Sequence, residues 1–512
     1  MAMYAIRRVV KYSLIGGSSL AFAGALYANN WNPSSLGVTR FGRAAWVVSS
    51  ISFDYRFSLR NCNDDSEESR SKWSMVHTRS AEKLLRLCST NGGVFIKVGQ
   101  HIAAMEYLVP HEYCDVLRVL HDRAPESTME GVREVIRKDL GREVEEIFEK
   151  FEDKPVGTAS LAQVHKAKIR DGPEVAVKVQ HPKVRDHSLV DMTTMDILVN
   201  IVARVFPEFS LLWLAQETRI NLPRELDFVL EGKNCEQVGR MFSNLKWLKV
   251  PEVFWEYTSS RVLTMEYLAG GKVTDKDYMI KNGINLREVS ERIGELYSEM
   301  IFVQGYVHCD PHPGNILVSK VDGKPQVILL DHGLYSNLPE KFRHQYSQLW
   351  FSLINSDLVG VKKWSLELGA GDLFPLLACI LAGKTWDTIT QGLTKARPKA
   401  AREKEDQELR VYARQYVHQI NAILSRVPRE MLLLFKTNDL LRGIEHSLGT
   451  KGERTSLITM SKFCVKSIYE KRLKTCSNSL SALIVHLQKN WQLTKISIYQ
   501  MYLWVSCLFV SI

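Results

Sequence analysis

Residues 308–333 carry carboxylate and amide side chains in a fixed order. His308-Cys-Asp310 is followed five residues later by Asn315, and Asp331-His-Gly333 comes sixteen residues after Asn315, at the end of an apolar run. Phosphoryl transfer requires one carboxylate that orients the attacking hydroxyl and further oxygen ligands that hold Mg²⁺ against the phosphates. Asp310 suits the first role, and Asn315 and Asp331 suit the second. Either piece alone could be a helix cap or a turn, but chance does not readily explain both at this spacing.

A turn of small residues precedes a predicted strand near residue 160. Its spacing matches the phosphate-covering loop of kinases, with alanine at 159 and 162 in place of two glycines. Alanine still lets backbone N–H groups approach phosphate oxygens, although it has less freedom at positive φ than glycine. The residues expected to line the nucleotide are Val156, Gly157, Thr158, Ala159, Ser160 and Val164. By itself, such a turn is more often a plain hairpin.

Lys178 stands fourteen residues after Val164, at the end of Val175-Ala-Val-Lys178. In kinases a lysine on the third strand contacts the α and β phosphates of ATP. An outward lysine on an exposed strand is the alternative interpretation. The lysine, the small-residue loop and the series at 308–333 together predict a kinase-like fold that binds ATP and Mg²⁺.

The predicted secondary structure divides the chain into a strand-rich part and a larger helical part. Apolar residues recur at helical spacing between 70 and 150, alternate as in strands between 155 and 180, and return to helical spacing between 186 and 205. Short strands are expected at 249–253, 261–265 and 325–330, and helices elsewhere beyond 273. This pattern predicts an α+β fold with two lobes. The expected domains are a targeting or anchor segment (1–35), a helical extension (36–150), a small lobe (151–270), a large lobe (271–455) and a basic, apolar tail (456–512).

The formal net charge of +10 comes from the two ends of the chain. Residues 1–53 contain five basic residues and no acidic residue, and residues 456–512 contain seven basic residues and one acidic residue. The body between them is close to neutral, whereas a nucleic-acid enzyme is usually basic across its working surface. We therefore expect no nucleic-acid partner, and we expect the basic ends to serve targeting or membrane contact.

The N-terminus has the features of a targeting sequence. Arg7, Arg8 and Lys11 precede a run of small and apolar residues over 13–28. This pattern fits a mitochondrial presequence or a short membrane anchor, and the secretory pathway is the alternative. The nine cysteines are scattered without a CxxC pair, and the only Asn-x-Ser/Thr match has a proline at its centre, which prevents glycosylation. Mitochondrial localisation with membrane association is therefore favoured over secretion.

The C-terminal residues 496–512 are uncharged and include two tyrosines and a tryptophan. Such a segment can lie in a membrane interface or pack against the preceding helices. The pattern does not favour one of these interpretations over the other.

A metal site is the competing interpretation of the 308–315 segment. His308 and His312 could bind a metal together with Asp310, but prolines flank His312 on both sides and no third soft ligand follows. Phosphoryl transfer is favoured, and no structural zinc is expected. Cys309 is expected to be a small packed residue, because no His or Asn partner pattern of a nucleophile surrounds it.

These residues resemble one family, the UbiB or aarF-domain atypical kinases, also called the ADCK group. The resemblance covers about residues 70–450 and looks strongest to the first animal subtype of the group. The segments that carry it are Lys97-Val-Gly-Gln100, Ser160-Leu-Ala-Gln-Val-His165, Val175-Ala-Val-Lys-Val-Gln180, Glu225-Leu-Asp227, His308-Cys-Asp-Pro-His-Pro-Gly-Asn315 and Asp331-His-Gly333.

The resemblance implies further roles in the nucleotide site. Lys178 would form an ion pair with Glu231, and the 53 residues between them would contain a helical insertion in the small lobe. Glu266 would lie at the hinge, where backbone groups bind adenine. The family loop usually has three alanines before Ser160, whereas Gly157 and Thr158 stand here, so its nucleotide preference does not carry over.

The resemblance also implies a regulatory lid. Lys97 and Gln100 belong to an N-terminal KxGQ segment that would fold over the active cleft. There Lys97 would meet Glu225 and Asp227, in the place where a protein substrate would otherwise bind. A lysine beside two carboxylates in a desolvated cleft holds a lid shut better than an exposed pair does.

The resemblance implies an atypical mitochondrial kinase or ATPase involved in lipid or quinone homeostasis and membrane organisation. Its partners would be a nucleotide and mitochondrial membrane lipids or membrane proteins. The alternative is a pseudokinase that regulates a partner without phosphotransfer, and ordinary protein kinase activity is disfavoured by the lid.

Overall fold

The computed structural model describes residues 36–60, 62, 66–103, 109–122, 125–206, 212–309, 312–392, 404–405, 408, 416–450 and 455–510. The chain forms two compact units. Unit 1 consists of Met1–Val132, Gly157–Gln163 and Gln180–Leu222, and unit 2 of Arg133–Val156, Val164–Val179 and Pro223–Ile512. The apolar run at 13–28 and Asp310 lie outside the described residues.

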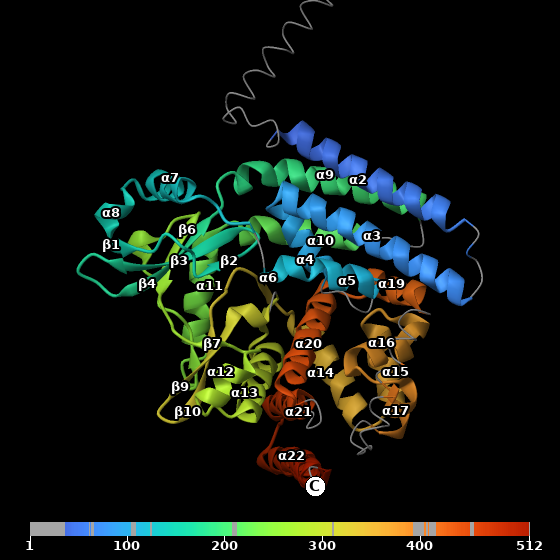
Figure 1. Cartoon of the computed structure of the whole chain (residues 1–512). Coiled ribbons are helices and arrows are strands. Elements are labelled where there is room, and N and C mark those ends of the chain that lie inside the picture. Colours follow the sequence, from blue (N-terminus) through green and yellow to red (C-terminus); the bar gives the residue numbers. More distant parts are fainter. Residues whose placement is uncertain are drawn as a thin grey trace, which may run out of the picture. The chain divides into compact units, whose positions relative to one another are not determined.

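Unit 1 is built mainly from helices. They are α2 (Gly37–Ser58), α3 (Glu67–Asn91), α4 (Val94–Ala103), α5 (His111–Leu117), α6 (Val119–Asp122), α9 (Val184–Val205) and α10 (Leu212–Glu225), whose last turn belongs to unit 2. Helix α2 packs against α3 and α9, and α3 packs against α4 and α5 (Figure 1). The helical pattern read between 186 and 205 corresponds to α9.

A buried ion pair joins α2 to α9. Arg40 Nε donates to Asp191 Oδ1 at 2.7 Å, and Arg40 Nη1 donates to the carbonyl oxygen of Asn91 at 2.6 Å. Both charged side chains are buried. Burial raises the pKa of Asp191, and the guanidinium of Arg40 opposes this effect. Because both partners are desolvated, the pair fixes the mutual register of the two helices.

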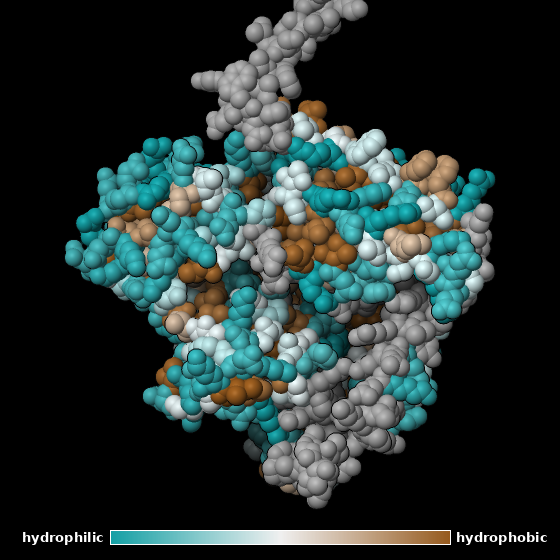
Figure 2. Space-filling model, viewed as in Figure 1, coloured by the Kyte–Doolittle hydropathy of each residue, from teal (hydrophilic) through white to brown (hydrophobic). Residues whose placement is uncertain are grey.

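A five-stranded sheet has most of its residues in unit 2, while Gly157–Gln163 and Gln180 belong to unit 1. Its path is β1 (Phe148–Phe151), β3 (Ala162–Ile169), β4 (Glu174–Gln180) and β6 (Val262–Glu266), with β2 (Gly157–Thr158) beside β3. Helices α7 (Met129–Leu140), α8 (Val144–Ile147) and α11 (Phe228–Met241) accompany it. Hydrophilic side chains cover the outer surface of α7, α8 and β1 (Figure 2).

A second sheet has four short strands in the order β5 (Leu248–Lys249), β10 (Lys324–Leu329), β9 (Ile316–Val321) and β7 (Gly271–Lys272). A separate ladder pairs β8 (Tyr306–His308) with β11 (Tyr335–Asn337). The strand expected at 249–253 is shorter than predicted, since only β5 and an isolated bridge from Val253 to Met265 form. Pro251 lies between them and has no N–H group to donate to a ladder.

The remainder of unit 2 is helical. Its helices are α12 (Lys276–Lys281), α13 (Leu286–Ser298), α14 (Glu340–Ile354), α15 (Leu358–Glu367), α16 (Phe374–Ala382), α17 (Trp386–Gln391), α19 (Val417–Arg426), α20 (Arg429–Leu448), α21 (Thr455–Lys474) and α22 (Ser479–Val510). Helix α21 packs against α13, α14 and α22. The basic tail predicted at 456–512 therefore forms two helices, of which α21 is part of the core of unit 2.

Helix α13 continues into a π-helical turn, Glu299–Gln304, which ends at Gly305. Gly305 has a φ of 70°, and a Cβ atom there would lie 2.8 Å from Arg343 Nη1. Glycine avoids both the strain of the left-handed conformation and this close contact. The turn at Gly305 directs the chain into β8, which leads to the predicted catalytic segment.

None of the helices in the described part of the chain combines the length and the apolar character needed to span a bilayer.

Candidate phosphoryl-transfer site

Lys178 lies on β4, between the fully buried residues Val177 and Val179. Its Nζ is 2.6 Å from Glu231 Oε1 and 3.2 Å from Asp331 Oδ2. The side chains of Lys178 and Glu231 are 13% and 2% exposed, and that of Asp331 is 29% exposed. The residues expected to form the Lys–Glu pair are therefore in contact inside unit 2. The predicted alternative, an outward lysine on an exposed strand, does not match this burial.

The three charges determine the protonation of Lys178. Burial alone would lower its pKa, but the carboxylates of Asp331 and Glu231 raise the pKa above its ordinary value. Burial raises the pKa of Glu231, and the ammonium of Lys178 opposes this effect. Lys178 therefore remains a cation at neutral pH, as a phosphate-binding lysine must.

Helix α11 positions Glu231. Asp227 caps its N-terminus, where Oδ1 accepts from the N–H groups of Val229 at 3.1 Å and Leu230 at 3.4 Å. The Nζ of Lys178 lies 5.2 Å from the ring centroid of Phe228 in the first turn. Because a cap stabilises the first turn of a helix, Asp227 helps to hold Glu231 opposite Lys178.

The β9–β10 hairpin brings Asn315 and Asp331 to one end of the second sheet. Ile316 pairs with Leu329, and one residue further along, Leu330 N donates to the carbonyl oxygen of Asn315 at 3.0 Å. Asp331 is the next residue after Leu330. The two residues predicted to bind Mg²⁺ therefore flank the same end of the hairpin.

Gly333 shapes the surroundings of Asp331. Its N–H donates to Asp331 Oδ1 at 3.0 Å, and a Cβ atom at this position would lie 3.4 Å from the same oxygen. This bond leaves the other carboxylate oxygen, Oδ2, facing Lys178. The glycine of the Asp-His-Gly sequence thus orients the carboxylate without covering it.

Strand β8 leads into the predicted catalytic segment. His308 Nε2 donates to the carbonyl oxygen of Asp331 at 3.0 Å, and Cys309 N donates to that of Leu334 at 3.0 Å. Cys309 is fully buried against Leu334 and Leu433, in agreement with its prediction as a packed residue. Asp310 follows directly but lies outside the described residues, so its role as the catalytic base stays a prediction.

His332 occupies the position of the usual kinase phenylalanine and is buried. Its Nε2 donates to the carbonyl oxygen of Leu329, and its Nδ1 accepts from the hydroxyl of Tyr335, both at 3.0 Å. The two rings are stacked, with centroids 5.8 Å apart. Burial and the neighbouring His308 lower the pKa of His332 to about 3. This histidine is therefore a neutral packing residue that also donates a hydrogen bond.

Asn234 supports the same segment. Its Nδ2 donates to the carbonyl oxygen of His332 at 2.9 Å, and its Oδ1 accepts from the hydroxyl of Tyr306 at 2.8 Å. Sequence reasoning missed this residue. It lies three positions after Glu231, on the same face of α11, and that spacing could have indicated it.

The small-residue loop is held together by backbone hydrogen bonds. Val156 N donates to the carbonyl oxygen of Val164, and Ala159 N to that of Ala162, both at 2.8 Å. Ser160 is buried, and a Cβ atom on Gly157 would meet no atom within 4 Å. A hairpin with this geometry suits either the nucleotide role or the plain turn considered above, and the roles of 156–160 and Val164 stay predictions.

His181 ties the loop tip to a second segment of unit 1. Its Nε2 donates to the carbonyl oxygen of Ala159 at 2.9 Å, its backbone N–H donates to that of Leu161 at 2.9 Å, and its Nδ1 accepts from Ser127 Oγ at 2.8 Å. Burial lowers the pKa of His181, and the bond to Ala159 opposes this effect. Sequence reasoning missed His181, because nothing in its local spacing indicates a contact with residue 127.

Glu266 ends β6 at the predicted hinge. Its Oε2 accepts from Lys249 Nζ at 2.7 Å and from the backbone N–H of Glu252 at 3.2 Å. The side chain is thus engaged within unit 2. This arrangement is compatible with the expectation that backbone groups, and not the carboxylate, contact adenine.

The KxGQ residues lie on α4 in unit 1. Lys97 is buried at 7% exposure, and Gln100 Nε2 donates to the carbonyl oxygen of Leu120 at 2.9 Å. A Cβ atom at Gly99 would lie 2.4 Å from Leu120 Cδ1, so glycine permits the close approach of α4 to α6. Glu225, at the end of α10, is also buried. The predicted lid contact of Lys97 with Glu225 and Asp227 stays a prediction.

Within the described ranges, no three His, Cys, Asp or Glu side chains lie close enough together to hold a metal ion. Asp310, which the alternative metal site requires, lies outside the described residues.

A family model described as the ABC1 atypical kinase-like domain matches residues 119–365. The chain is 48% identical over 502 residues to AarF domain-containing protein kinase 1 of Gallus gallus, covering 98% of this chain and 96% of that protein. It is 46% identical over 506 residues to the Mus musculus protein of the same name, with coverage of 98% and 96%. AarF domain-containing kinase 1 of Drosophila melanogaster is 46% identical over 504 residues, with coverage of 97% of each chain. The chain belongs to the ABC1/AarF family of atypical kinases.

Membership in the ABC1/AarF family confirms the predicted resemblance and the kinase-like α+β fold. A kinase-like domain implies a nucleotide ligand. Lys178, Glu231 and Asp331 come together in unit 2, and all three lie within the matched residues.

Proposed function

We propose that this ABC1/AarF protein is an ATP-binding, Mg²⁺-dependent atypical kinase or ATPase. It acts on a lipid-related small molecule, or it uses ATP hydrolysis to drive a process of membrane lipids. The observation that carries the proposal is the simultaneous contact of Lys178 with Glu231 and Asp331, at 2.6 and 3.2 Å. In kinases this lysine must be paired with a glutamate, and the aspartate must be in place, before phosphoryl transfer can occur.

The proposed roles follow from the chemistry of each side chain. Lys178 binds the α and β phosphates, and Asp310 orients the attacking hydroxyl or water. Asn315 and Asp331 offer oxygen ligands, which a hard cation such as Mg²⁺ prefers. Asp331 is partly exposed and lies beside Gly333, which has no side chain to cover it. These residues fit Mg²⁺, which when bound neutralises the charge of the transferring phosphoryl group.

The proposed setting is a mitochondrial membrane, where the protein contributes to lipid homeostasis and membrane organisation. Support comes from the acid-free N-terminus with its apolar run and from the basic C-terminal segment. Fractionation of cells followed by carbonate extraction tests this setting. Recovery in the mitochondrial fraction is expected, and recovery in the secretory pathway would overturn it.

The enzymatic proposal is tested by Mg²⁺-dependent ATP turnover of the purified full chain with liposomes present. Asp310→Asn is expected to lower turnover by at least about 100-fold, because a positioned catalytic base contributes that much. The matched control is Asp322→Asn, since Asp322 is exposed in the β9–β10 turn at a φ of 51° that asparagine also tolerates. Equal turnover of the wild type and Asp310→Asn would remove the enzymatic proposal.

The second candidate is a pseudokinase that binds nucleotide and regulates a partner. Support for it comes from the KxGQ segment that the family resemblance identifies, because such a segment folded over the cleft would exclude protein substrates. Lys97→Ala is expected to change nucleotide affinity or to produce autophosphorylation, whereas Lys72→Ala, an exposed lysine on α3, should do neither. If both variants behave like the wild type, the lid is not regulatory.

A further inference from the structure

Helix α22 exposes an apolar stripe along one side. Seven side chains form it, and each is between 48% and 68% exposed: Leu480, Leu483, Ile484, Leu487, Trp491, Ile498 and Met501. At 100° per residue they occupy one sector of about 100° on the helix surface. Single exposed apolar residues are ordinary, but a stripe of seven on one helix indicates a surface that something covers.

The opposite side of α22 holds it on the protein. Lys489 Nζ lies 3.4 Å from Glu470 Oε1, and Gln500 Oε1 accepts from Lys462 Nζ at 2.6 Å. Ile496, on this side, is buried. Helix α22 is therefore anchored along α21, and the stripe is the side that α21 leaves uncovered.

The helix that carries the stripe has two lysines and no acidic residue, and acidic partners from neighbouring helices lie at Lys471 (Glu340) and Lys489 (Glu470). Glu470 is the last acidic residue of the sequence, whereas five basic residues follow it: Lys471, Arg472, Lys474, Lys489 and Lys495. The Nζ of Lys495 lies 5.5 Å from the ring centroid of Trp491, at the border of the stripe. Apolar side chains, a tryptophan and flanking lysines without acids are the composition of helices that lie in the interface of an anionic bilayer.

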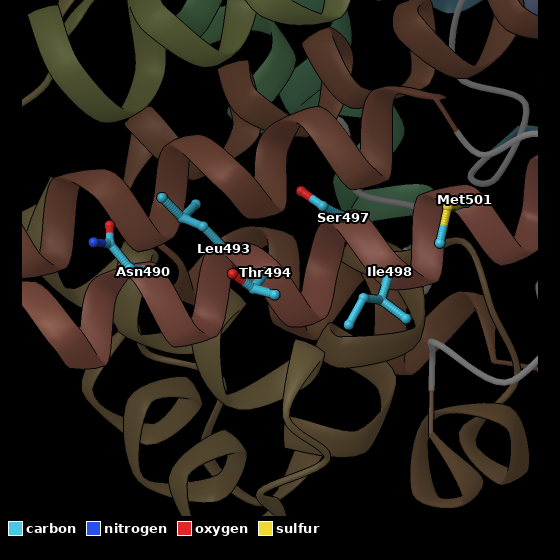
Figure 3. Close-up of a pocket in the computed structure, with 6 residues that line it drawn as sticks. All are labelled: Asn490, Leu493, Thr494, Ser497, Ile498 and Met501. Atoms are coloured by element: carbon cyan, nitrogen blue, oxygen red, sulfur yellow. The ribbon is translucent and has the colours of Figure 1, made fainter.

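A shallow depression of about 400 Å³ lies along the C-terminal half of the stripe. Its lining is Asn490, Leu493, Thr494, Ser497, Ile498 and Met501 (Figure 3). All six lining residues come from α22, and two of them, Ile498 and Met501, belong to the stripe. A fluid acyl chain can fill such an open depression without a shape-matched partner.

The geometry of α22 decides how it would meet a bilayer. Its 32 residues extend about 48 Å at 1.5 Å per residue, and one long side is packed on α21. A helix packed in this way can contact a membrane only with its long exposed side, so its axis would lie parallel to the membrane surface.

We propose that the exposed stripe of α22 docks the protein on the surface of an anionic phospholipid bilayer, with the helix in the plane of the interface. The inference rests on the proposed membrane setting, and it does not depend on phosphoryl transfer. It names the segment of the chain that contacts the membrane, and it specifies that the lipids carry negative charge.

Vesicle flotation of the full chain tests the proposal with phosphatidylcholine vesicles that contain or lack phosphatidylserine. Leu487→Gln with Trp491→Gln should weaken binding at least about 10-fold, because two large apolar side chains no longer enter the interface. Lys474→Glu with Lys495→Glu should abolish the preference for phosphatidylserine. The control pair, Ile280→Gln with Val359→Gln, replaces apolar residues on α12 and α15 that are at least as exposed, and it should bind like the wild type.

A position-specific probe separates α22 from the N-terminal segment, which could also bind lipid. A photoreactive amino acid at Leu487 should give lipid adducts on bound vesicles, and the same probe at Val359 should give none. Equal amounts of lipid adduct at the two positions would overturn the proposal. It would also be overturned if the protein with Leu487→Gln and Trp491→Gln lost a self-associated form but still bound vesicles, because the stripe would then contact a second copy of the chain. Failure of the enzymatic proposal remains distinguishable, since Asp310→Asn should bind vesicles normally.

Discussion

Lys178 is paired with two carboxylates that different elements supply, Glu231 from α11 and Asp331 from the end of β10. Such a pair is costly to desolvate, and breaking a buried pair on one side leaves a charge without compensation. Since Asp331 is the more exposed carboxylate, we expect Glu231 to contribute more than Asp331 to the stability of the fold. The interaction is therefore both a structural constraint and the centre of the proposed nucleotide site.

Glu231→Gln is predicted to destabilise unit 2 by about 2 kcal/mol, because Lys178 loses its buried counterion and keeps only Asp331. The midpoint of thermal unfolding measures this loss. The control is Glu149→Gln on β1 of unit 2, whose carboxylate forms an exposed pair with Lys168 that contributes little. Equal midpoints for the two variants would contradict the account of the buried pair.

The hydrogen bonds of the His181 side chain predict that the stability of the fold depends on pH. The pKa of His181 is lowered in the folded chain, so below the unfolded value of about 6.5 the unfolded chain binds more protons. The contribution of His181 is complete above that pH and is lost as the pH falls through it. Between about pH 7.5 and about pH 5.5, the unfolding midpoint of the wild type should fall more than that of His181→Gln.

The control for this measurement is His486→Gln, which removes an exposed histidine of α22. It should show the pH dependence of the wild type. If His181→Gln also shows the dependence of the wild type, His181 does not titrate in this range as argued.

At the scale of elements, helices α2 and α9 are joined by Arg40 and Asp191, which are separated by 151 residues in the sequence. Asp191→Asn is predicted to cost about 3 kcal/mol of stability in unit 1, because it leaves the guanidinium buried without a counterion. Thermal unfolding measures the loss against Asp196→Asn on the same helix α9, which changes a partly exposed pair with Arg219 of α10. A loss of equal size in both variants would show that burial of the pair contributes nothing.

Local sequence signals identified the elements better than their contacts. Periodicity indicated α9 and the strands around Lys178, because amphipathic spacing is a local property. It overestimated the strand at 249–253, where Pro251 removes a donor, and it gave no sign of the π-helical turn before Gly305. The contacts of His181 and Asn234 were missed, since bonds to residues 127 and 306 depend on how distant segments meet.

At the scale of the whole molecule, the site motifs could be recognised from sequence because phosphoryl transfer restricts both the residue types and their spacing. Lys178, Asn315 and Asp331 were predicted in this way, while Glu231 and Lys97 came from the family resemblance. The charge count placed the basic excess at the chain ends but could not distinguish an interfacial helix from a packed one. In the structure, α22 packs on α21 with one side and exposes apolar residues between 480 and 501 on the other.

The central claim is that Lys178, Glu231 and Asp331 form a Mg²⁺-nucleotide site, and calorimetric titration of the full chain with Mg²⁺ and ATP tests it most directly. Lys178→Met and the charge-retaining Lys178→Arg are compared with Lys168→Met, which replaces an exposed lysine on the adjacent strand β3. We predict that both Lys178 variants bind at least about 10-fold more weakly than the wild type, since an ammonium in fixed geometry contacts the phosphates. Lys168→Met should bind like the wild type. Unchanged affinity in folded Lys178→Met and Lys178→Arg proteins would contradict the account.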